Sequence, residues 1–357
     1  MKIEATTIFI DTNILLSPLK IEKSIPFEEL LLTLYPFKNS IVIPSHVFSE
    51  FYDNFESTFN SSKKEIQRAI EETSRSFDQI IKQLSILGHH NKITIELQKR
   101  KTISDVEESI DKRIRQLKAD AKRIYDHIEE ILSLQTNGDY SVKERYVLMA
   151  EYDARCRRSI APGYKDSGKD NENDYGDLFI WQEILDFMHE RAEDGSRDAI
   201  FITNDFKADW RGERSESQLQ TEYGEYVFDG TFSVMSFGEF QELHRKQISS
   251  FVSKYKRLIK MIKKDTWGKD EFTVFLSLVK TMDLSLPFFL AMLSEELKKQ
   301  LNILVQPFKT EILQLGIDFL SFSPRGNAVL RNAGLASLQK LMNCPISEMK
   351  KRVTSGE

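Results

Sequence analysis

Short apolar runs that end in an acid or a proline are the feature that most constrains the fold of this chain. Each run is rich in β-branched and aromatic residues and has the length of a buried strand. Helical stretches separate the runs, and strands that alternate with helices form a parallel sheet covered on both faces. The sequence therefore predicts an α/β fold. The runs are TTIFID (6–11), SIVIPS (40–45), DAIFITND (198–205) and, as two short pieces around a turn, EYVFDGTFSVMSF (225–237).

Residues 61–134 depart from this alternation. Apolar residues recur there in steps of three or four along two long stretches, which is the spacing of one helical face. The segment GHHN (88–91) lies between the two stretches and is typical of a turn. We therefore expect a long antiparallel helical hairpin, about 61–134, inserted into the α/β domain. A packed hairpin is the simpler interpretation, and pairing with a partner chain is the alternative.

The net charge of −5 is unevenly distributed, because residues 1–240 are acidic and residues 241–357 are basic. The stretch RKQISSFVSKYKRLIKMIKK (245–264) has eight basic residues and no acid, and its apolar residues share one helical face. We predict two domains, 1–244 and a basic, mostly helical domain at 245–357. Three roles for the basic stretch stay open: a nucleic-acid contact, a solvated face, or a dock for the acidic N-terminal domain.

Cysteine content and hydropathy indicate a cytoplasmic protein. The two cysteines, Cys156 and Cys344, are too few for a disulfide framework or a thiolate zinc site. Lys2 and Asp11 interrupt what would be the apolar core of a signal peptide. The longest apolar run, PFFLAML (287–293), is far shorter than the ~20 residues of a membrane span. We therefore expect no membrane contact.

Four acids occupy related positions at the ends of the predicted elements. Asp11 and Asp205 end two predicted strands, whereas Glu50 and Asp177 lie in the first turns of helices. In an open parallel sheet, ligands bind beyond the carboxyl ends of the strands, where the following helices begin. The four carboxylates are therefore expected to converge in one cleft.

Unpaired carboxylates in one cleft repel and desolvate one another. A hard divalent cation resolves this conflict, because Mg²⁺ takes oxygen ligands and Mn²⁺ can replace it. The pattern thus favours a divalent metal site. For Asp11 alone, helix capping is the alternative. Asp174 and Asp209 are either further ligands or solvated surface acids.

The same residues resemble a known family. The motifs D-T-N, P-x-x-V-x-x-E, G-D at the start of a helix and T-N-D at the end of a strand occur in the order typical of PIN-domain nucleases. Three longer segments resemble a PIN-like subfamily often found in bacterial proteins, namely PGYKDSGK (162–169), YGDLFIW (175–181) and FITNDFKADW (201–210). The resemblance covers about residues 1–240. It implies a PIN-like three-layer sandwich with a mainly parallel central sheet, interrupted by the hairpin.

The resemblance also implies metal-dependent hydrolysis of phosphodiester bonds, most often in RNA. One or two Mg²⁺ or Mn²⁺ ions would lower the pKa of a bound water and orient the hydroxide toward the scissile bond. The expected metal ligands and catalytic residues are Asp11, Glu50, Asp177 and Asp205. Residues expected to orient ligands or waters are Thr12, Asn13, Thr203, Asn204 and Asp209. Residues expected to contact the substrate are Tyr164, Lys165, Asp166, Lys169 and Lys207.

Three functions stay open from the sequence. The first is a metal-dependent endoribonuclease, the second a DNA-cleaving nuclease, and the third a catalytically silent PIN-like module that binds nucleic acid or scaffolds a complex. Silent relatives tend to lose one of the four acids, and this chain keeps them all. The hairpin and the helical tail suggest a toxin-like or antiviral defence effector, regulated by a protein partner or by homo-oligomerisation. An RNA-processing nuclease is the alternative setting.

Overall fold

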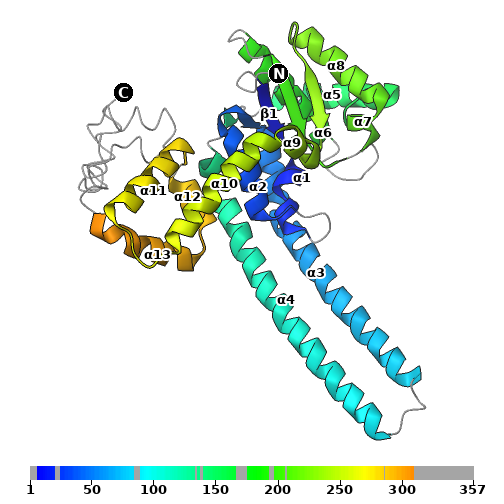
Figure 1. The fold of residues 1–357 in the computed structure, drawn as a ribbon. Coiled ribbons are helices and arrows are strands. Elements are labelled where there is room, and N and C mark those ends of the chain that lie inside the picture. The colour runs from blue at the N-terminus through cyan, green and yellow to red at the C-terminus, as the bar shows by residue number, and fades with distance from the viewer. Residues whose placement is uncertain are drawn as a thin grey trace. The chain divides into compact units, whose positions relative to one another are not determined.

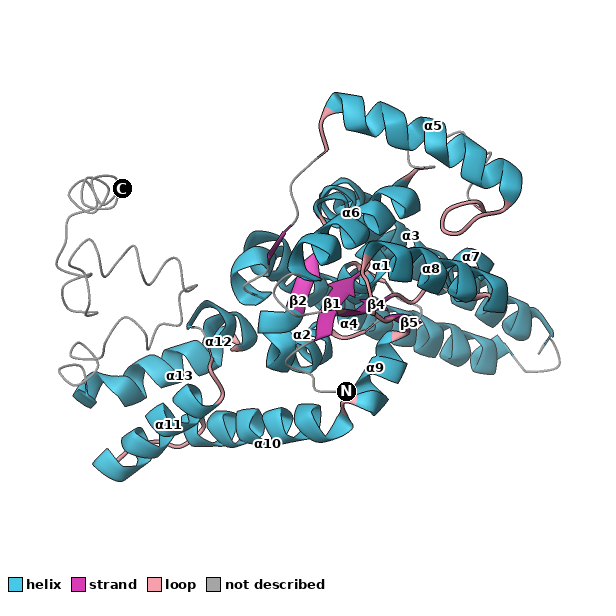
Figure 2. Ribbon diagram, turned by 90° about the horizontal axis from the view of Figure 1, so that it is seen from above, coloured by secondary structure: helices cyan, strands magenta, loops and turns pink. Residues whose placement is uncertain are grey.

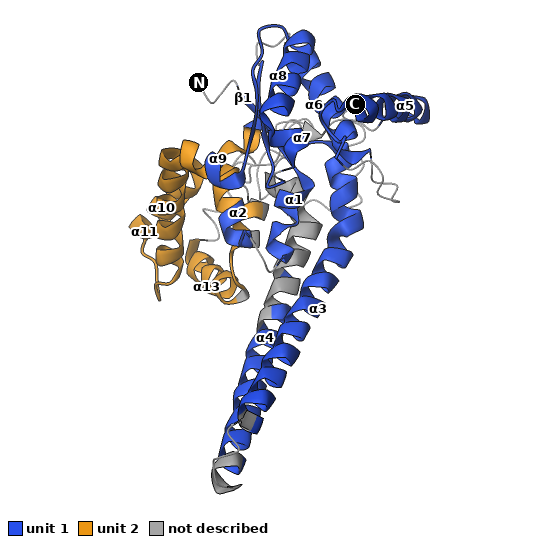
Figure 3. Cartoon of the chain, turned by 90° about the vertical axis from the view of Figure 1, so that its right-hand side faces the viewer, with its two compact units in different colours: residues 1–30, 40–126, 135–240 blue, residues 31–39, 127–134, 241–357 orange. Residues whose placement is uncertain are grey.

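The fold is taken from a computed structural model that describes residues 6–20, 25–83, 89–132, 135–136, 140–165, 175–192, 197–205, 207–284 and 286–308. Of the predicted site residues, Asp166, Lys169 and Asp174 lie outside these ranges, as do the helices expected after residue 308. The chain divides into two compact units (Figure 3). The first comprises residues 1–30, 40–126 and 135–240, and the second residues 31–39, 127–134 and 241–357.

The first unit is built on a parallel sheet. Its strands are β1 (Thr6–Ile10), β2 (Ile41–Ile43), β3 (Gln135–Thr136), β4 (Asp198–Ile202) and β5 (Phe232–Met235), in the spatial order β3-β2-β1-β4-β5. Every strand pairing is parallel, and β1 lies beside β4 with Ile8 opposite Ile200. Figure 2 shows the strands surrounded by helices. The predicted α/β fold with a mainly parallel sheet is confirmed.

Burial explains why these segments are strands. Every residue of β1 and β2 is buried, which matches sequences composed only of β-branched and aromatic residues. Two helices pack on β5 through aromatic rings: Trp181 of α6 (Gly176–Arg191) and Tyr223 of α8 (Glu213–Tyr226) lie 4.8 and 5.4 Å from the ring of Phe232. In the last predicted run only the second piece is a strand. The expectation of a strand before the turn is wrong, because Glu225 and Tyr226 complete α8.

The remaining helices of this part of the chain lie between the strands in the sequence, except α9, which follows the last strand. They are α1 (Thr12–Leu15), α2 (Phe27–Leu34), α3 (Ser45–Gln83), α4 (His89–Leu132), α5 (Val142–Arg158), α7 (Ala208–Arg211) and α9 (Phe237–Leu243). Two 3-10 helices, η2 (Ser17–Leu19) and η3 (Tyr35–Ser40), lie on either side of α2 in the sequence.

The predicted hairpin consists of α3 and α4, which run side by side (Figure 1). Asp78 of α3 forms an ion pair with Lys99 of α4. An apolar groove of about 480 Å³ lies between the two helices, lined by residues such as Ile70, Phe77 and Ile103. The hairpin is not a separate insertion, because its first helix, α3, begins directly after β2. Glu50 lies in the second turn of this helix.

The second unit is helical. It contains α10 (Arg245–Ile262), α11 (Lys269–Thr281), α12 (Leu286–Met292), α13 (Glu295–Val305) and η5 (Gln306–Phe308). Residues of η3 belong to it: Tyr35 stacks on Phe288 at 3.6 Å, and the buried Lys38 pairs with Asp283 at 2.7 Å. Across the described residues, no helix is long and apolar enough to cross a membrane.

Candidate metal-binding site at the carboxyl edge of the sheet

Asp11 and Asp205 come together because their strands are neighbours. Asp11 directly follows β1, and its N–H donates to the carbonyl of Ile202 in β4 at 3.0 Å. Thr203, the residue after β4, donates its N–H to Met235 of β5 at 3.0 Å. The hydrogen bonding between β1 and β4, and that between β4 and β5, therefore continues one residue past the strands. The two acids emerge at the same carboxyl edge, as the sequence predicts.

A polar network fixes this edge. The hydroxyl of Thr203 donates to the Asp11 carboxylate at 2.5 Å and accepts the N–H of Asp205 at 2.9 Å. The amide of Asn13 donates to Asp11 and, at 2.8 Å, to Thr203, and its oxygen accepts the N–H of Asn204 at 2.9 Å. The D-T-N and T-N-D motifs are thus the two halves of one hydrogen-bonded unit.

Glu50 approaches the same edge from the second turn of α3. Its carboxylate accepts a hydrogen bond of 2.6 Å from the Thr12 hydroxyl and lies 3.4 Å from Nε2 of His46. Gly176, at the start of α6, permits this placement. A Cβ there would lie 2.5 Å from Oε1 of Glu50, and the Thr12 hydroxyl and the contact with His46 already hold that carboxylate in position. The glycine of the Y-G-D motif is therefore needed for close packing.

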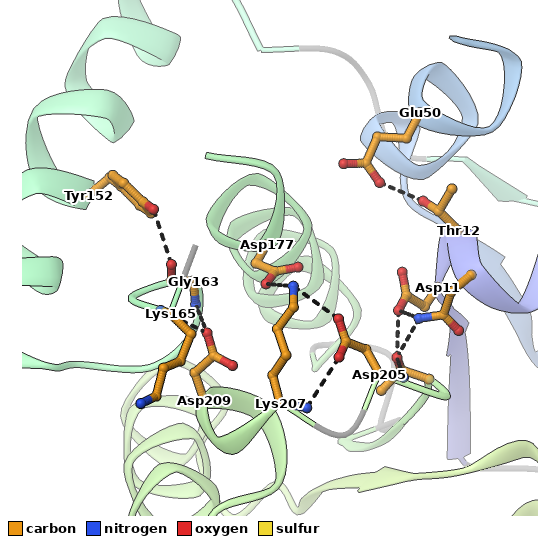
Figure 4. A network of polar contacts seen from close by, with 12 residues as sticks. Asp11, Thr12, Glu50, Tyr152, Gly163, Lys165, Asp177, Asp205, Lys207 and Asp209 are labelled. Carbon is orange, nitrogen blue, oxygen red and sulfur yellow. Dashed lines mark hydrogen bonds and ion pairs between the residues drawn. The ribbon is translucent and has the colours of Figure 1, made fainter. Parts of the chain in front are cut away.

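Asp177 follows in the first turn of α6, where the helix dipole favours an acid. Lys207 lies between this carboxylate and that of Asp205, with Nζ 3.8 Å from Asp177 and 3.0 Å from Asp205 (Figure 4). Four carboxylates from four segments thus face one region, with one ammonium among them.

The four carboxylates of the site outnumber the Lys207 ammonium that contacts two of them, so the site has an excess of negative charge. Burial and, to a smaller extent, the charges of Glu50 and Asp205 raise the pKa of Asp11 to about 6, against the hydrogen bond from Thr203, which lowers it. Burial also acts to raise the pKa of Glu50, but His46, the Thr12 hydroxyl and Lys207 together outweigh it and hold that pKa below its usual value. A cation bound nearby would therefore favour the ionised form of the Asp11 carboxylate.

The donor set suits a hard divalent cation in its chemistry, since it offers only carboxylate oxygens in the inner positions. As the side chains stand, no three acids, histidines or cysteines within the described ranges surround a common point at metal-ligand distances. Lys207 and the hydroxyls of Thr12 and Thr203 provide the compensating contacts instead. The four acids would have to close around an ion by side-chain rotation.

The loop with the sequence PGYK packs beside these acids. Gly163 has a φ of 90°, and a Cβ there would lie 3.5 Å from Cβ of Asp177. The fully buried Asp209 accepts the N–H groups of Gly163 and Lys165, each at 3.2 Å, and Tyr152 donates to the carbonyl of Gly163 at 3.1 Å. Asp209 therefore anchors the loop and makes no hydrogen bond to the other acids in the described structure.

The anchored loop presents the predicted substrate residues. Lys165 is exposed, and its ammonium lies 5.7 Å from the ring centre of the half-buried Tyr164. Trp210, which follows Asp209 in α7, is 1% exposed and packs against Phe201, so it belongs to the core. From the sequence, His46 is the one histidine expected near the cleft, in a structural role; it donates its backbone N–H to the buried Glu183 and contacts Glu50.

Comparisons with known proteins agree with this arrangement. A family model described as a PIN like domain matches residues 7–224, which includes both strand-end acids, Glu50 and Asp177. No curated protein and no solved structure matches the chain.

Proposed function

Because the chain belongs to the PIN-like domain family, whose members are generally nucleases, we propose that it is a metal-dependent endonuclease that hydrolyses phosphodiester bonds, in RNA before DNA. The observation that carries the proposal is the convergence of Asp11, Glu50, Asp177 and Asp205 on one edge of the sheet (Figure 4). An acid with a structural role is normally paired with a cation or caps the N-terminus of a helix. Here one ammonium, that of Lys207, lies within ion-pair distance of two of these acids, Asp177 and Asp205.

The residues divide into three roles. Asp11, Glu50, Asp177 and Asp205 would hold one or two Mg²⁺ or Mn²⁺ ions, which supply an activated water and neutralise charge on the leaving oxygen. The hydroxyl of Thr203 and the amide of Asn13 orient the Asp11 carboxylate for this purpose.

On the substrate side, the ammonium groups of Lys165 and Lys207 can bind non-bridging phosphate oxygens as point charges. The half-buried ring of Tyr164 can stack on a base. Asp166 and Lys169 continue the same loop in the sequence and are proposed substrate contacts as well.

Cleavage of end-labelled RNA and DNA of one sequence, with Mn²⁺, Mg²⁺ or EDTA, tests the proposal. We expect metal-dependent cleavage by the wild type and none by the double variant Asp11→Asn, Asp205→Asn. The matched control replaces Asp105 and Asp111, two exposed acids of α4, by asparagine. Cleavage retained by the first double variant would refute the four-carboxylate site. Cleavage of the DNA but not of the RNA would show that DNA, and not RNA, is the substrate.

We also propose that a protein partner or a second copy of the chain regulates the activity, as in a cytoplasmic toxin-like or antiviral defence effector. Helices of 39 and 44 residues extend well beyond what the cleavage site requires, and they leave an apolar groove between them. A monomer that cleaves RNA constitutively would contradict this regulation. A silent binding module is the second candidate function, and full metal binding without cleavage of any nucleic acid would favour it.

A further inference from the structure

The helix α10 separates its apolar and basic residues completely. Phe251, Tyr255, Leu258 and Ile262 are all buried within the second unit. Tyr35 packs on Phe251 with ring centres 5.7 Å apart, which places η3 against this face. The apolar side of the helix is therefore already occupied.

The opposite side of α10 is chemically uniform. Every exposed residue of the helix is a cation or a serine: Arg245, Lys246, Ser249, Ser250, Ser253, Lys254, Lys256, Arg257 and Lys260. We call this set the basic face. The helix contains no acid. A solvated helix surface ordinarily mixes the two charge signs, because like charges on neighbouring turns repel.

Most of these cations have no counter-charge in the described structure. Arg245 pairs with Glu242, but none of the other five cations on the helix forms an ion pair with a described residue. Lys246, Arg257 and Lys260 stand 11 and 3 residues apart, so they lie on one side of the helix and extend over about 21 Å of its axis. Several consecutive phosphates of a nucleic-acid strand fit this length.

We propose that the basic face of α10 binds the phosphate backbone of single-stranded RNA, as a second contact separate from the carboxylate site. Lysine and arginine supply the charge, and the serine hydroxyls can donate to phosphate oxygens. The face has no exposed aromatic ring and no base-reading amide, so the contact is independent of sequence. The inference rests on the proposed function only for the choice of RNA as the polyanion.

Two other partners fit the observations less well. A helix that lies on a membrane inserts its apolar side among the lipids, whereas the apolar side of α10 is buried. A protein interface is centred on apolar or aromatic anchors, and the basic face has none. A polyanion that presents only phosphates remains the best match.

Fluorescence anisotropy of the full chain with a labelled single-stranded RNA, in EDTA and at several salt concentrations, tests the proposal. The triple variant Lys246→Gln, Arg257→Gln, Lys260→Gln removes three exposed charges. For single strands each neutralised phosphate contributes about −0.7 to the slope of log K against log salt, so the slope should fall by about 2. At 0.1 M salt this corresponds to about 100-fold weaker binding.

The matched control is Lys63→Gln, Lys64→Gln, Arg68→Gln on α3. It changes the net charge equally, but its three exposed cations alternate with acids. We expect it to keep the wild-type slope. The pair Lys254→Gln, Lys256→Gln, at the flanks of the basic face, gives an independent measurement with an expected reduction in slope of about 1.

An unchanged slope in the α10 variants, or equal losses in the α3 control, would overturn the proposal. Variants that bind RNA like the wild type but no longer bind vesicles containing phosphatidylserine would assign the basic face to a membrane and overturn it too. Because the titration is run in EDTA, a lack of RNA cleavage contradicts the proposed function alone and leaves this result intact.

Discussion

Replacement of Asp11 by asparagine should stabilise the metal-free protein and abolish its response to metal. The pKa of Asp11 rises from 3.8 to about 6 through burial and through the charges of Glu50 and Asp205. The unfolded chain therefore loses this proton at lower pH than the folded chain. A rise of this size lowers the free energy of unfolding by about 3 kcal/mol at neutral pH.

The observable gain is smaller than this limit. Asp11 keeps part of its surface exposed, and solvent screens its charge. Asparagine also weakens the hydrogen bonds from Thr203 and Asn13, each worth about 1 kcal/mol. We expect a net gain of about 1 kcal/mol, or a Tm about 2–4 °C higher for a unit of this size. The gain should be present above pH 6 and should shrink as the pH falls from 6 toward 4.

Thermal unfolding in EDTA at several pH values measures this gain, and the same scans with Mn²⁺ measure the response to metal. Saturation at about 100-fold above Kd should stabilise the wild type by about 2.7 kcal/mol and leave Asp11→Asn unchanged. The order of the two Tm values therefore reverses when Mn²⁺ is added. Asp105→Asn, an exposed acid of α4, controls for net charge. An asparagine variant that is less stable in EDTA, with the full Mn²⁺ shift retained, would refute the reasoning.

The other predictions concern the groups around the acids. Lys207→Met should tighten Mn²⁺ binding several-fold in calorimetry, because the ammonium competes for the same carboxylates; weaker binding would contradict this. Gly176→Ala should move Glu50 and reduce the Mn²⁺-induced Tm shift, whereas Gly224→Ala, where a Cβ meets nothing within 4 Å, should not. Asp209→Ala should cost about 1–3 kcal/mol in urea unfolding by leaving the buried N–H of Gly163 and the partly buried N–H of Lys165 unpaired, and an unchanged midpoint would argue against this anchor.

The sequence predicted the site residues whose position depends only on the direction in which a strand or helix runs. A strand of apolar residues that ends in an acid places that acid at a known edge of a parallel sheet, so Asp11 and Asp205 could be placed without coordinates. Glu50 and Asp177 followed from helices that begin at the same edge. Hydrophobic periodicity likewise predicted the hairpin, because two long stretches with one apolar face can bury that face only by pairing.

Contacts between distant segments could not be predicted in this way. Asp209 anchors Gly163 and Lys165 from more than forty residues away, and nothing in its local sequence separates it from a surface acid. The packing of Tyr35 and Lys38 with residues after 241 has the same character. Such contacts depend on which surfaces meet after the sheet has formed, and spacing along the chain contains no information on that.

The site also shows how four carboxylates can be tolerated without an ion. The Thr12 hydroxyl and His46 stabilise Glu50, and Lys207 neutralises part of the charge of Asp205. Asp11 receives neutral donors from Thr203 and Asn13, and burial together with the charges of Glu50 and Asp205 raises its pKa to about 6. Below a pH of about 6, a cation that binds must displace the proton of Asp11. Above that pH the Asp11 carboxylate is already ionised. Asp11, at the end of the central strand, therefore lies in a negative environment that a bound metal ion would neutralise.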